Sequence, residues 1–421
     1  MRLPRIAADI TPLRVSRDYR LLIAGVMATG LGTQAALVAL PYQLFVETRS
    51  AFLTGLLGAV EVGPLIAMAL FGGALADRHD RRRLLLGVQV GLVAAAALLA
   101  LVTFLGSPPI AILYVLGGLT AGFGAIQNVV QASIVPNVVP PDLVKSALAL
   151  DFGLYQVTFV AGPALGGLLI GTLGVGAAYT ADALSCLAMV AAAAAIAPQP
   201  PRGVTTDEPQ AVLHSIAEGL RFVRRNNALL GSFAIDLLAM TFGMPRALFA
   251  VLAVSVYGAG AEGTGLLYTA VAAGALVAAL TTGWLANARR LGLITIWAVV
   301  AWGAAIAAAG LAGSLWVAAV LFALAGAADS VSAVCRTAIN QSVTPDHLRG
   351  RMSSVYSLVV TSGPRLGDVE SGSVAALAGV RFSVVSGGLA TIAGAGLVVL
   401  AFPALLRYDA RRHLPDHPMP G

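Results

Sequence analysis

Residues Gly72 to Leu85 read GGALADRHDRRRLL, and six of the seven residues from Asp77 to Arg83 are charged. Only 11% of the whole chain is charged, so this is a local concentration of charge. Apolar runs of roughly 20 residues, the length that crosses a bilayer as a helix, lie on both sides of it. The stretch therefore predicts a short loop between two membrane spans, and its arginines place that loop on the cytoplasmic side.

The composition also indicates a membrane protein. Hydrophobic residues make up 58% of the 421 residues, more than a soluble domain of this size can bury. Twelve apolar runs predict an all-α integral membrane protein with twelve transmembrane helices. The predicted spans are residues 21–45, 52–76, 84–105, 110–134, 146–171, 174–197, 228–256, 264–287, 291–312, 315–337, 352–378 and 382–405.

The basic residues predict the orientation of these spans. Arginines are frequent in alternate loops, whereas the opposite loops contain only Arg49 and Arg381. By the positive-inside rule, both termini are expected in the cytoplasm of a multi-pass protein of the plasma (inner) membrane. The net charge of +6 could suggest nucleic acid, but the basic residues lie between apolar runs. Contact with the anionic inner leaflet explains the positive charge. We therefore expect the lipid bilayer as a partner and do not expect nucleic acid.

Three weak internal echoes, at offsets of 201 to 210 residues, indicate two homologous halves. QASIVPNVVPPDL resembles RTAINQSVTPDHL, AGPALGG around Pro163 resembles SGPRLGD around Pro364, and Asn287 stands where Asp77 stands. The predicted domains are an N-terminal six-helix half at 1–197 and a C-terminal six-helix half at 228–421. Between them, 198–227 is predicted to be a Pro-rich cytoplasmic linker that continues into an amphipathic interfacial helix.

At these residues the chain resembles the major facilitator superfamily of transporters. The family's signature loop between its second and third spans has counterparts at Gly73, Asp77, Arg78, Arg81 and Arg82. Asp80 stands where the family has a small residue. The resemblance covers essentially the whole chain, and it is closest to the branch of enterobactin-type siderophore exporters and macrolide or multidrug efflux pumps. It implies two halves that give alternating access to a central site.

Proton-coupled exporters of the family carry a Gly-Pro-x-x-Gly-Gly motif in the fifth span. Its counterparts here are Gly162, Pro163, Gly166 and Gly167. Proline removes a backbone donor and glycines allow another helix to approach closely, so a bendable helix is expected. The resemblance favours export over import. An arginine that many antiporters place in the fourth span is missing, because Gly118 occupies that position.

Ionisable side chains inside the spans are the candidates for proton coupling. Each costs roughly 2.5–3.5 kcal/mol on the insertion scale, so these residues are expected to face a central cavity. The proton-coupling candidates are Glu61 in the second span, Asp236 in the seventh and Glu370 in the eleventh. The alternative for each is ordinary packing or a structural ion pair.

Six polar or charged residues are candidates for lining the substrate cavity, namely Gln34, Gln127, Gln131, Tyr155, Arg246 and Asp329. For the uncharged ones, hydrogen bonding between helices is the alternative. Arg246 would bind an anionic substrate group, act on Glu61 or form a structural pair. Asp236 and Arg246 lie about 15 Å apart on one predicted helix, so each is expected to find a partner on another span.

Other charged residues are assigned structural roles. Arg336 shares a helix face with Asp329 and is expected to reach the inner membrane surface. Arg365 and Asp368 are spaced to pair within their own helix. Asp182, like Asp151, is expected to cap a helix or to pair at a gate.

The predicted function is proton-driven efflux of a small amphipathic molecule, a drug or siderophore, by a protein that works as a monomer. The partners are therefore that substrate and protons. An importer, a facilitator and an integral-membrane enzyme are the alternatives. The sequence has no phosphate-binding loop, catalytic cluster or metal-ligand spacing, so we expect a transporter without metal or cofactor. Asp77 is predicted to latch the inner side of the outward-facing state against the eleventh span near Arg349 and Arg351.

Overall fold

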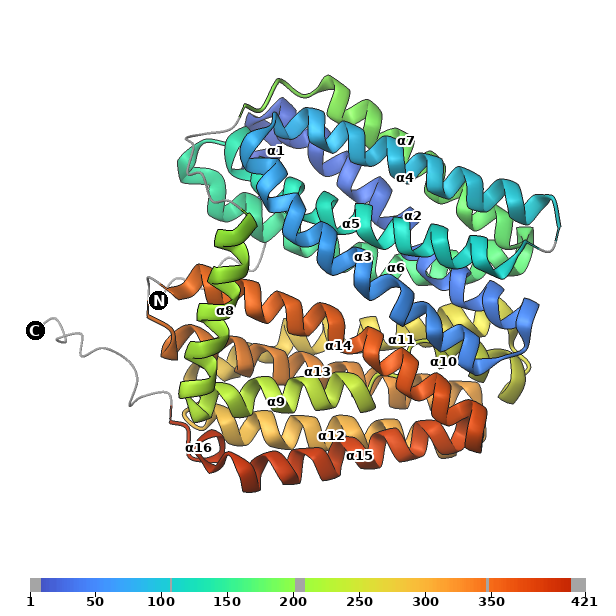
Figure 1. The fold of residues 1–421 in the computed structure, drawn as a ribbon, viewed down its shortest axis with the longest axis vertical. Coiled ribbons are helices and arrows are strands. Elements are labelled where there is room, and N and C mark those ends of the chain that lie inside the picture. Colours follow the sequence, from blue (N-terminus) through green and yellow to red (C-terminus); the bar gives the residue numbers. More distant parts are fainter. Residues whose placement is uncertain (1–8, 107, 201–208, 346–347, 410–421) are drawn as a thin grey trace, which may run out of the picture. The chain divides into compact units, whose positions relative to one another are not determined.

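The computed structural model describes residues 9–106, 108–200, 209–345 and 348–409, apart from side chains at some helix positions that include Asp77 and Asn287. All the elements in these ranges are helical (Figure 1). The first part of the chain forms α1 (Thr11–Val15), α2 (Arg17–Thr48), α3 (Ala51–Arg78), α4 (Arg81–Phe104), α5 (Ile110–Val138), η1 (Pro141–Leu143), α6 (Val144–Leu173) and α7 (Val175–Ala195).

The second part of the chain begins with α8, the helix expected in the linker. It forms α8 (Pro209–Arg225), α9 (Asn227–Phe242), α10 (Leu248–Val251), η2 (Leu252–Val256), α11 (Gly260–Thr281), η3 (Thr282–Asn287), α12 (Leu291–Leu311), α13 (Leu315–Val343), α14 (Arg349–Ala378), α15 (Val380–Ala401) and α16 (Pro403–Leu406). In α8, Val223 is buried while Arg221, Arg224 and Arg225 are exposed, but Leu220 is exposed as well, at 48%. The side chains of residues 209–216 lie outside the described part of this helix.

The chain groups into two compact units. Unit 1 consists of Met1–Arg49, Val60–Pro209 and Gly260–Thr269, and unit 2 consists of Ser50–Ala59, Gln210–Ala259 and Ala270–Gly421. The start of α3 therefore belongs to unit 2, and the start of α11 belongs to unit 1.

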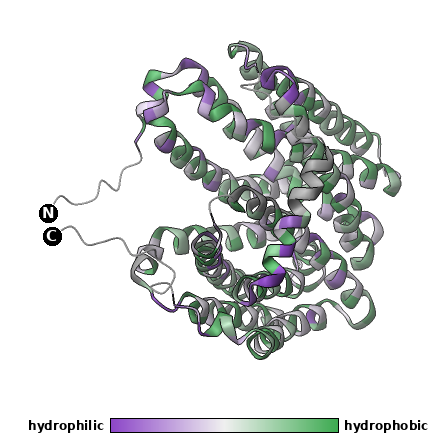
Figure 2. Ribbon diagram, turned by 60° about the vertical axis from the view of Figure 1, so that its left-hand side comes forward, coloured by the Kyte–Doolittle hydropathy of each residue, from purple (hydrophilic) through white to green (hydrophobic). Residues whose placement is uncertain are grey.

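Ten helices in the described ranges are long and apolar enough to cross a membrane. Apolar residues run along their lengths (Figure 2). These ten correspond to the predicted spans other than the seventh and the eleventh. α14 has the required length at 30 residues but carries Arg365, Asp368 and Glu370 in its second half. The seventh span is interrupted, so the count of twelve spans stays a prediction.

The prediction of one continuous helix over 228–256 is wrong. α9 ends at Phe242 and α10 begins at Leu248. Pro245 lies in the interruption, and proline both removes a backbone donor and disfavours helical geometry at the preceding residue. Side chains from other helices bond the backbone of the interruption. The Trp302 indole donates to the Gly243 carbonyl at 2.8 Å, and the Ala247 N–H donates to Asp368 Oδ1 at 2.8 Å.

The glycines of the Gly-Pro-x-x-Gly-Gly motif bring α6 close to two other helices of unit 1. A Cβ atom at Gly166 would lie 2.8 Å from the Ala35 backbone of α2. A Cβ at Gly167 would lie 2.9 Å from Gly265 Cα, at the start of α11. The expectation of close helix approach at this motif is confirmed.

The echo of this motif has the same role in unit 2. Gly363 and Gly367 of α14 pack against Met240 and Thr241 of α9. In unit 1 a glycine pair of the motif therefore faces α2, and in unit 2 the glycine pair of the echo faces α9. These two helices correspond to the first predicted span of each half. This agreement supports the internal repeat inferred from the sequence.

Replacing Gly166 by valine should destabilise unit 1, because the new side chain meets backbone atoms of Ala35 that cannot rotate away. We expect a loss of about 1–3 kcal/mol, measured as a lower unfolding temperature of the purified protein. Gly63→Val is the matched control, since a Cβ at Gly63 of α3 would meet nothing within 4 Å. Equal unfolding temperatures for the two variants would contradict this account of the packing.

Candidate functional site

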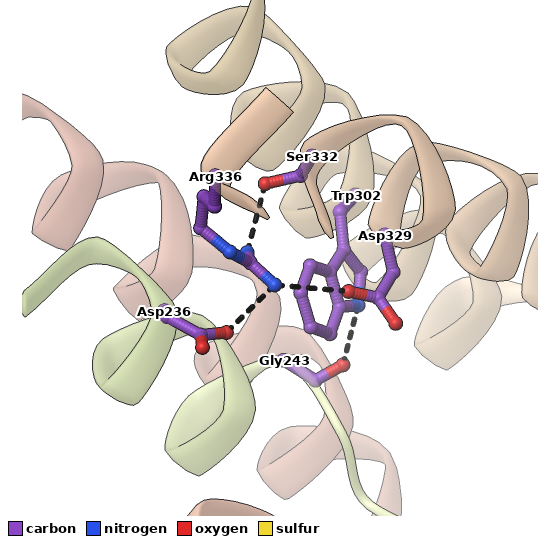
Figure 3. A network of polar contacts seen from close by, with 6 residues as sticks. All are labelled: Asp236, Gly243, Trp302, Asp329, Ser332 and Arg336. Atoms are coloured by element: carbon purple, nitrogen blue, oxygen red, sulfur yellow. Dashed lines mark hydrogen bonds and ion pairs between the residues drawn. The ribbon is translucent and has the colours of Figure 1, made fainter. Parts of the chain in front are cut away.

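A buried ion-pair network in unit 2 joins α9 to α13 (Figure 3). Arg336 Nη2 lies 2.8 Å from Asp236 Oδ1 and 3.8 Å from Asp329 Oδ1. Arg336 is 2% exposed and Asp236 is 1% exposed. Asp329 and Arg336 are seven residues apart on α13, which is two helical turns and places both on one face. One arginine therefore lies between two carboxylates inside the helix bundle.

The network leaves hydrogen-bonding capacity unused. Arg336 Nη1 donates to Ser332 Oγ, one turn earlier on α13, at 2.8 Å. Among the described groups, both Asp236 oxygens, Asp329 Oδ1 and Arg336 Nε have no aligned hydrogen-bond partner. The short contact of Asp236 with Arg336 is thus a charge contact whose geometry is not that of a hydrogen bond. Carboxylate oxygens that accept no hydrogen bond can take up a proton without first losing a donor.

The structure corrects the role expected for Arg336. Its guanidinium does not reach the membrane surface, because it turns inward to Asp236. The expectation that Asp236 finds its partner on another span is confirmed. The reason given for it was wrong, since Asp236 and Arg246 are separated by the interruption after α9 and do not share one helix.

A second set of charges surrounds that interruption. Arg246 lies within it and acts electrostatically on both Asp329 and Asp368. Asp368 accepts the hydrogen bond from Ala247, and Arg365 Nη1 donates to the Thr361 carbonyl at 3.0 Å. Arg365 also acts electrostatically on Asp368, and a direct pair between these two residues stays a prediction. Three arginines and three aspartates are therefore associated with one broken helix, whereas the sequence predicted only separate pairs among them.

The other proton and cavity candidates are not brought into this network by any described contact. Glu61 on α3 and Glu370 on α14 are both half-buried. Their role in proton coupling stays a prediction.

In unit 1 the polar candidates are spread over α2, α5 and α6. Gln34 is buried, and the base of its side chain packs against Gly162, so its role in lining a cavity stays a prediction. Gln127 and Gln131 are half-buried, and the Gln131 Nε2 atom has no partner among the described groups. Tyr155 is 50% exposed and stacks on Phe159.

The charged stretch from Asp77 to Arg83 contains the short connection between α3 and α4. Asp80 caps α4, because its Oδ1 accepts from the Arg83 N–H at 3.1 Å. Arg82 Nε donates to the Ala193 carbonyl at 3.0 Å, at the end of α7. A cation at a helix C-terminus satisfies the last carbonyls and complements the helix dipole. The family's basic residue therefore fastens α4 to α7.

The glycines and the other arginines of this stretch lie in different environments. A Cβ at Gly72 would lie 3.2 Å from Ile126 Cα, so α3 approaches α5 closely there, whereas a Cβ at Gly73 would meet nothing within 4 Å. Arg78 is exposed, and Arg81 donates its backbone N–H to the Gln199 carbonyl at 3.0 Å. The proposed latch between Asp77 and the Arg349–Arg351 segment rests on side chains outside the described ones.

Sequence reasoning also misplaced Asp182. This residue neither caps a helix nor pairs with a cation among the described residues. It is 4% exposed on α7 and accepts a hydrogen bond from Thr33 Oγ1 at 3.3 Å. Among the described residues, no three His, Cys, Asp or Glu side chains are grouped so that they could hold a metal ion.

Comparisons with known proteins agree with this architecture. A family model described as transmembrane secretion effector matches residues 7–421. The enterobactin exporter EntS of Citrobacter koseri is 27% identical over 390 residues, covering 91% of this chain and 90% of that protein. The enterobactin exporter EntS of Escherichia coli K12 is 27% identical over 388 residues, covering 90% and 89%.

Solved transporter structures share the fold. A POT family transporter in complex with 5-aminolevulinic acid has a TM-score of 0.71 at 9% identity, covering 93% of this chain and 97% of that one. A bacterial homologue of the iron transporter ferroportin in an inward-facing state has a TM-score of 0.66 at 17% identity, covering 92% and 98%. At these identities the likeness shows the fold alone. With the family model matched over nearly its whole length, the chain belongs to the transmembrane secretion effector family of the major facilitator superfamily, and it is a membrane efflux transporter and not an enzyme.

Proposed function

We propose that this transporter exports its substrate in exchange for protons, and that one coupling proton binds in the network of Arg336, Asp236 and Asp329. The observation that carries the proposal is the position of one buried arginine, 2.8 Å from one carboxylate and 3.8 Å from the other. Two carboxylates compete for a single guanidinium in a low-dielectric interior. A proton on either one shifts the guanidinium toward the other.

The same contact links proton binding to helix movement. Asp236 lies on α9 and Arg336 on α13, so their ion pair holds two helices together. A proton on Asp236 removes the negative charge and weakens that link. Alternating access needs such an element with two arrangements, each favoured by a different protonation state.

The remaining assignments complete the proposal. The two halves, 1–197 and 228–421, would alternate around a central cavity, with 198–227 as linker. The protein would act as a monomer in the inner membrane, with both termini in the cytoplasm. Glu61 and Glu370 stay candidates for further proton binding, and Arg246 for contact with an anionic substrate group. Asp77 would latch the inner side of the outward-facing state.

Enterobactin is the first substrate to test. Two relatives matched over about nine-tenths of this chain are named enterobactin exporters. Identity of 27% leaves room for a different cargo, so a panel of siderophores and drugs in an efflux-deficient host belongs in the same experiment.

Inverted membrane vesicles with an acidic interior should accumulate enterobactin through the wild-type protein, because protons leaving the vesicle drive the substrate inward. Asp329→Asn should lose this accumulation and retain exchange of labelled for unlabelled enterobactin, which needs no net proton movement. Asp142→Asn, at an exposed carboxyl in η1, is the control and should behave as wild type. Wild-type accumulation that does not depend on the gradient would overturn proton coupling.

Asp236→Asn should destabilise the protein, because it removes the nearer carboxylate from a buried arginine. Breaking a buried pair costs up to about 3–5 kcal/mol, and the remaining Asp329 should reduce that loss. The double variant Asp236→Asn/Arg336→Gln should recover most of the unfolding temperature without recovering gradient-driven transport. If the double variant transports with normal coupling, the network serves only to stabilise the fold.

Asp77→Asn should impair transport while leaving membrane insertion intact, measured as uptake per amount of protein in the membrane. Asp80→Asn is a matched control three residues away. It makes the same chemical change at the cap of α4, where asparagine serves as well as aspartate. Equal transport by both variants would mean that the charged stretch from Asp77 to Arg83 serves only to set the membrane topology.

A further inference from the structure

A buried carboxylate in unit 1 plays no part in the network described above. Asp182 lies on α7, where it is 4% exposed. Its Oδ1 accepts from Thr33 Oγ1 of α2 at 3.3 Å and from Cys186 Sγ, one turn along α7, at 3.8 Å. Cys186 in turn contacts Thr29 Oγ1 at 3.4 Å. The carboxyl group thus accepts hydrogen bonds from one hydroxyl group and one thiol group.

The titratable groups that act on Asp182 are Cys186 and Tyr179, both on its own helix. Tyr179 donates its hydroxyl proton to Gln43 Oε1 of α2 at 2.9 Å. The neighbouring helices α2, α4 and α6 carry their charged residues toward their ends, at Arg17, Asp18, Arg20, Glu47, Arg81, Arg82, Arg83, Lys145 and Asp151.

The cation that contacts α7 is too far away to neutralise Asp182. Arg82 is bonded to the carbonyl of Ala193, eleven residues further along the helix. That spacing corresponds to about 16 Å. No arginine, lysine or histidine in the described part of the chain forms an ion pair with Asp182. An ionised carboxyl at this position would therefore be an uncompensated charge inside the membrane, which is costly.

The contacts of α2 link this carboxyl to the Gly-Pro-x-x-Gly-Gly motif. A Cβ at Gly32 would lie 2.9 Å from Asp182 Cα, and the next residue, Thr33, donates to the carboxyl. The two residues after that face the motif on α6: Gln34 packs against Gly162, and Ala35 packs against Gly166. Four consecutive residues of α2 therefore contact Asp182 on one side and the motif on the other.

We propose that Asp182 binds an exchangeable proton in unit 1, in addition to the proton bound by the network in unit 2. A change in the packing of α6 on α2 moves Thr33 relative to Asp182, and this alters how strongly the carboxyl holds its proton. The proton enters from the outer side and leaves to the cytoplasm, so the transport cycle takes up two protons for each exported molecule. This inference rests on the proposed proton-driven export.

Infrared difference spectroscopy on the protein in nanodiscs tests proton binding directly and needs no substrate. The chain has two cysteines, so Cys335→Ala leaves Cys186 as the only thiol. The S–H band of Cys186 then reports on the hydrogen bond to Asp182. Labelling aspartate with ¹³C identifies the carboxyl band.

With rising pH we expect a protonated-aspartate band to disappear and the Cys186 S–H band to shift over the same pH range. Asp182→Asn should remove the shift of the S–H band, whereas Asp142→Asn should retain it. An S–H band that does not respond to pH in the chain with native Asp182 would overturn the proposal. This readout does not depend on whether Asp182→Asn folds.

The transport arm counts protons moved per molecule of enterobactin in vesicles. Asp182→Asn should lower this ratio from two to one, while Asp182→Glu should restore it. A wild-type ratio retained by Asp182→Asn would refute the role of Asp182 and leave the network in unit 2 standing. Wild-type transport that moves no protons would instead refute the proposed function itself.

Discussion

Backbone groups inside a membrane cannot bond to water, and this constraint shapes unit 2. Pro245 interrupts the helix that begins with α9, which frees a carbonyl at Gly243 and an N–H at Ala247. Trp302 and Asp368 bond to these groups from other helices. Two helices must therefore pack where the break occurs, and one of them brings the carboxyl of Asp368 to it. Asp236, the carboxylate nearer to Arg336, lies on the helix that leads into this break.

The two units hold their buried acids in different ways. In unit 2 the aspartates of the network share an arginine, so in the proposed cycle a proton would compete with an ion pair between helices. In unit 1 Asp182 has neutral donors, so in the proposed cycle its proton would respond to the packing of α2 between α6 and α7. Both arrangements join a carboxyl to a contact between helices. They differ in what a bound proton would do. In unit 2 it would take the place of an arginine beside the carboxylate, and in unit 1 it would neutralise a carboxylate that has no cation beside it among the described residues.

Much of the helix content could be predicted because the length of an apolar run directly reports the thickness of the bilayer. The predicted span 84–105 became α4 (Arg81–Phe104), and 174–197 became α7 (Val175–Ala195). The break in the seventh span had a signal, the Gly-Met-Pro sequence at Gly243, which the apolar character of the run concealed. The pairing of Arg336 with Asp236 had none, because it depends on which helix faces meet in three dimensions. Asp182 was missed for the same reason: sequence gives its depth in the membrane but not its neighbours.

The start of α3 packs in unit 2, where Gly55 lies against Asp368 and Gly372 of α14, and the start of α11 packs in unit 1 against Gly167. Each compact unit is therefore completed by a segment that the other half of the sequence encodes. If the halves arose by duplication, the ancestral half had a surface that was covered only when a second copy of the same chain packed against it. Such an ancestor would have been a symmetric dimer with exchanged helix ends. The later fusion into one chain then freed the two copies to diverge, one keeping an acid at Asp77 and the other carrying Asn287.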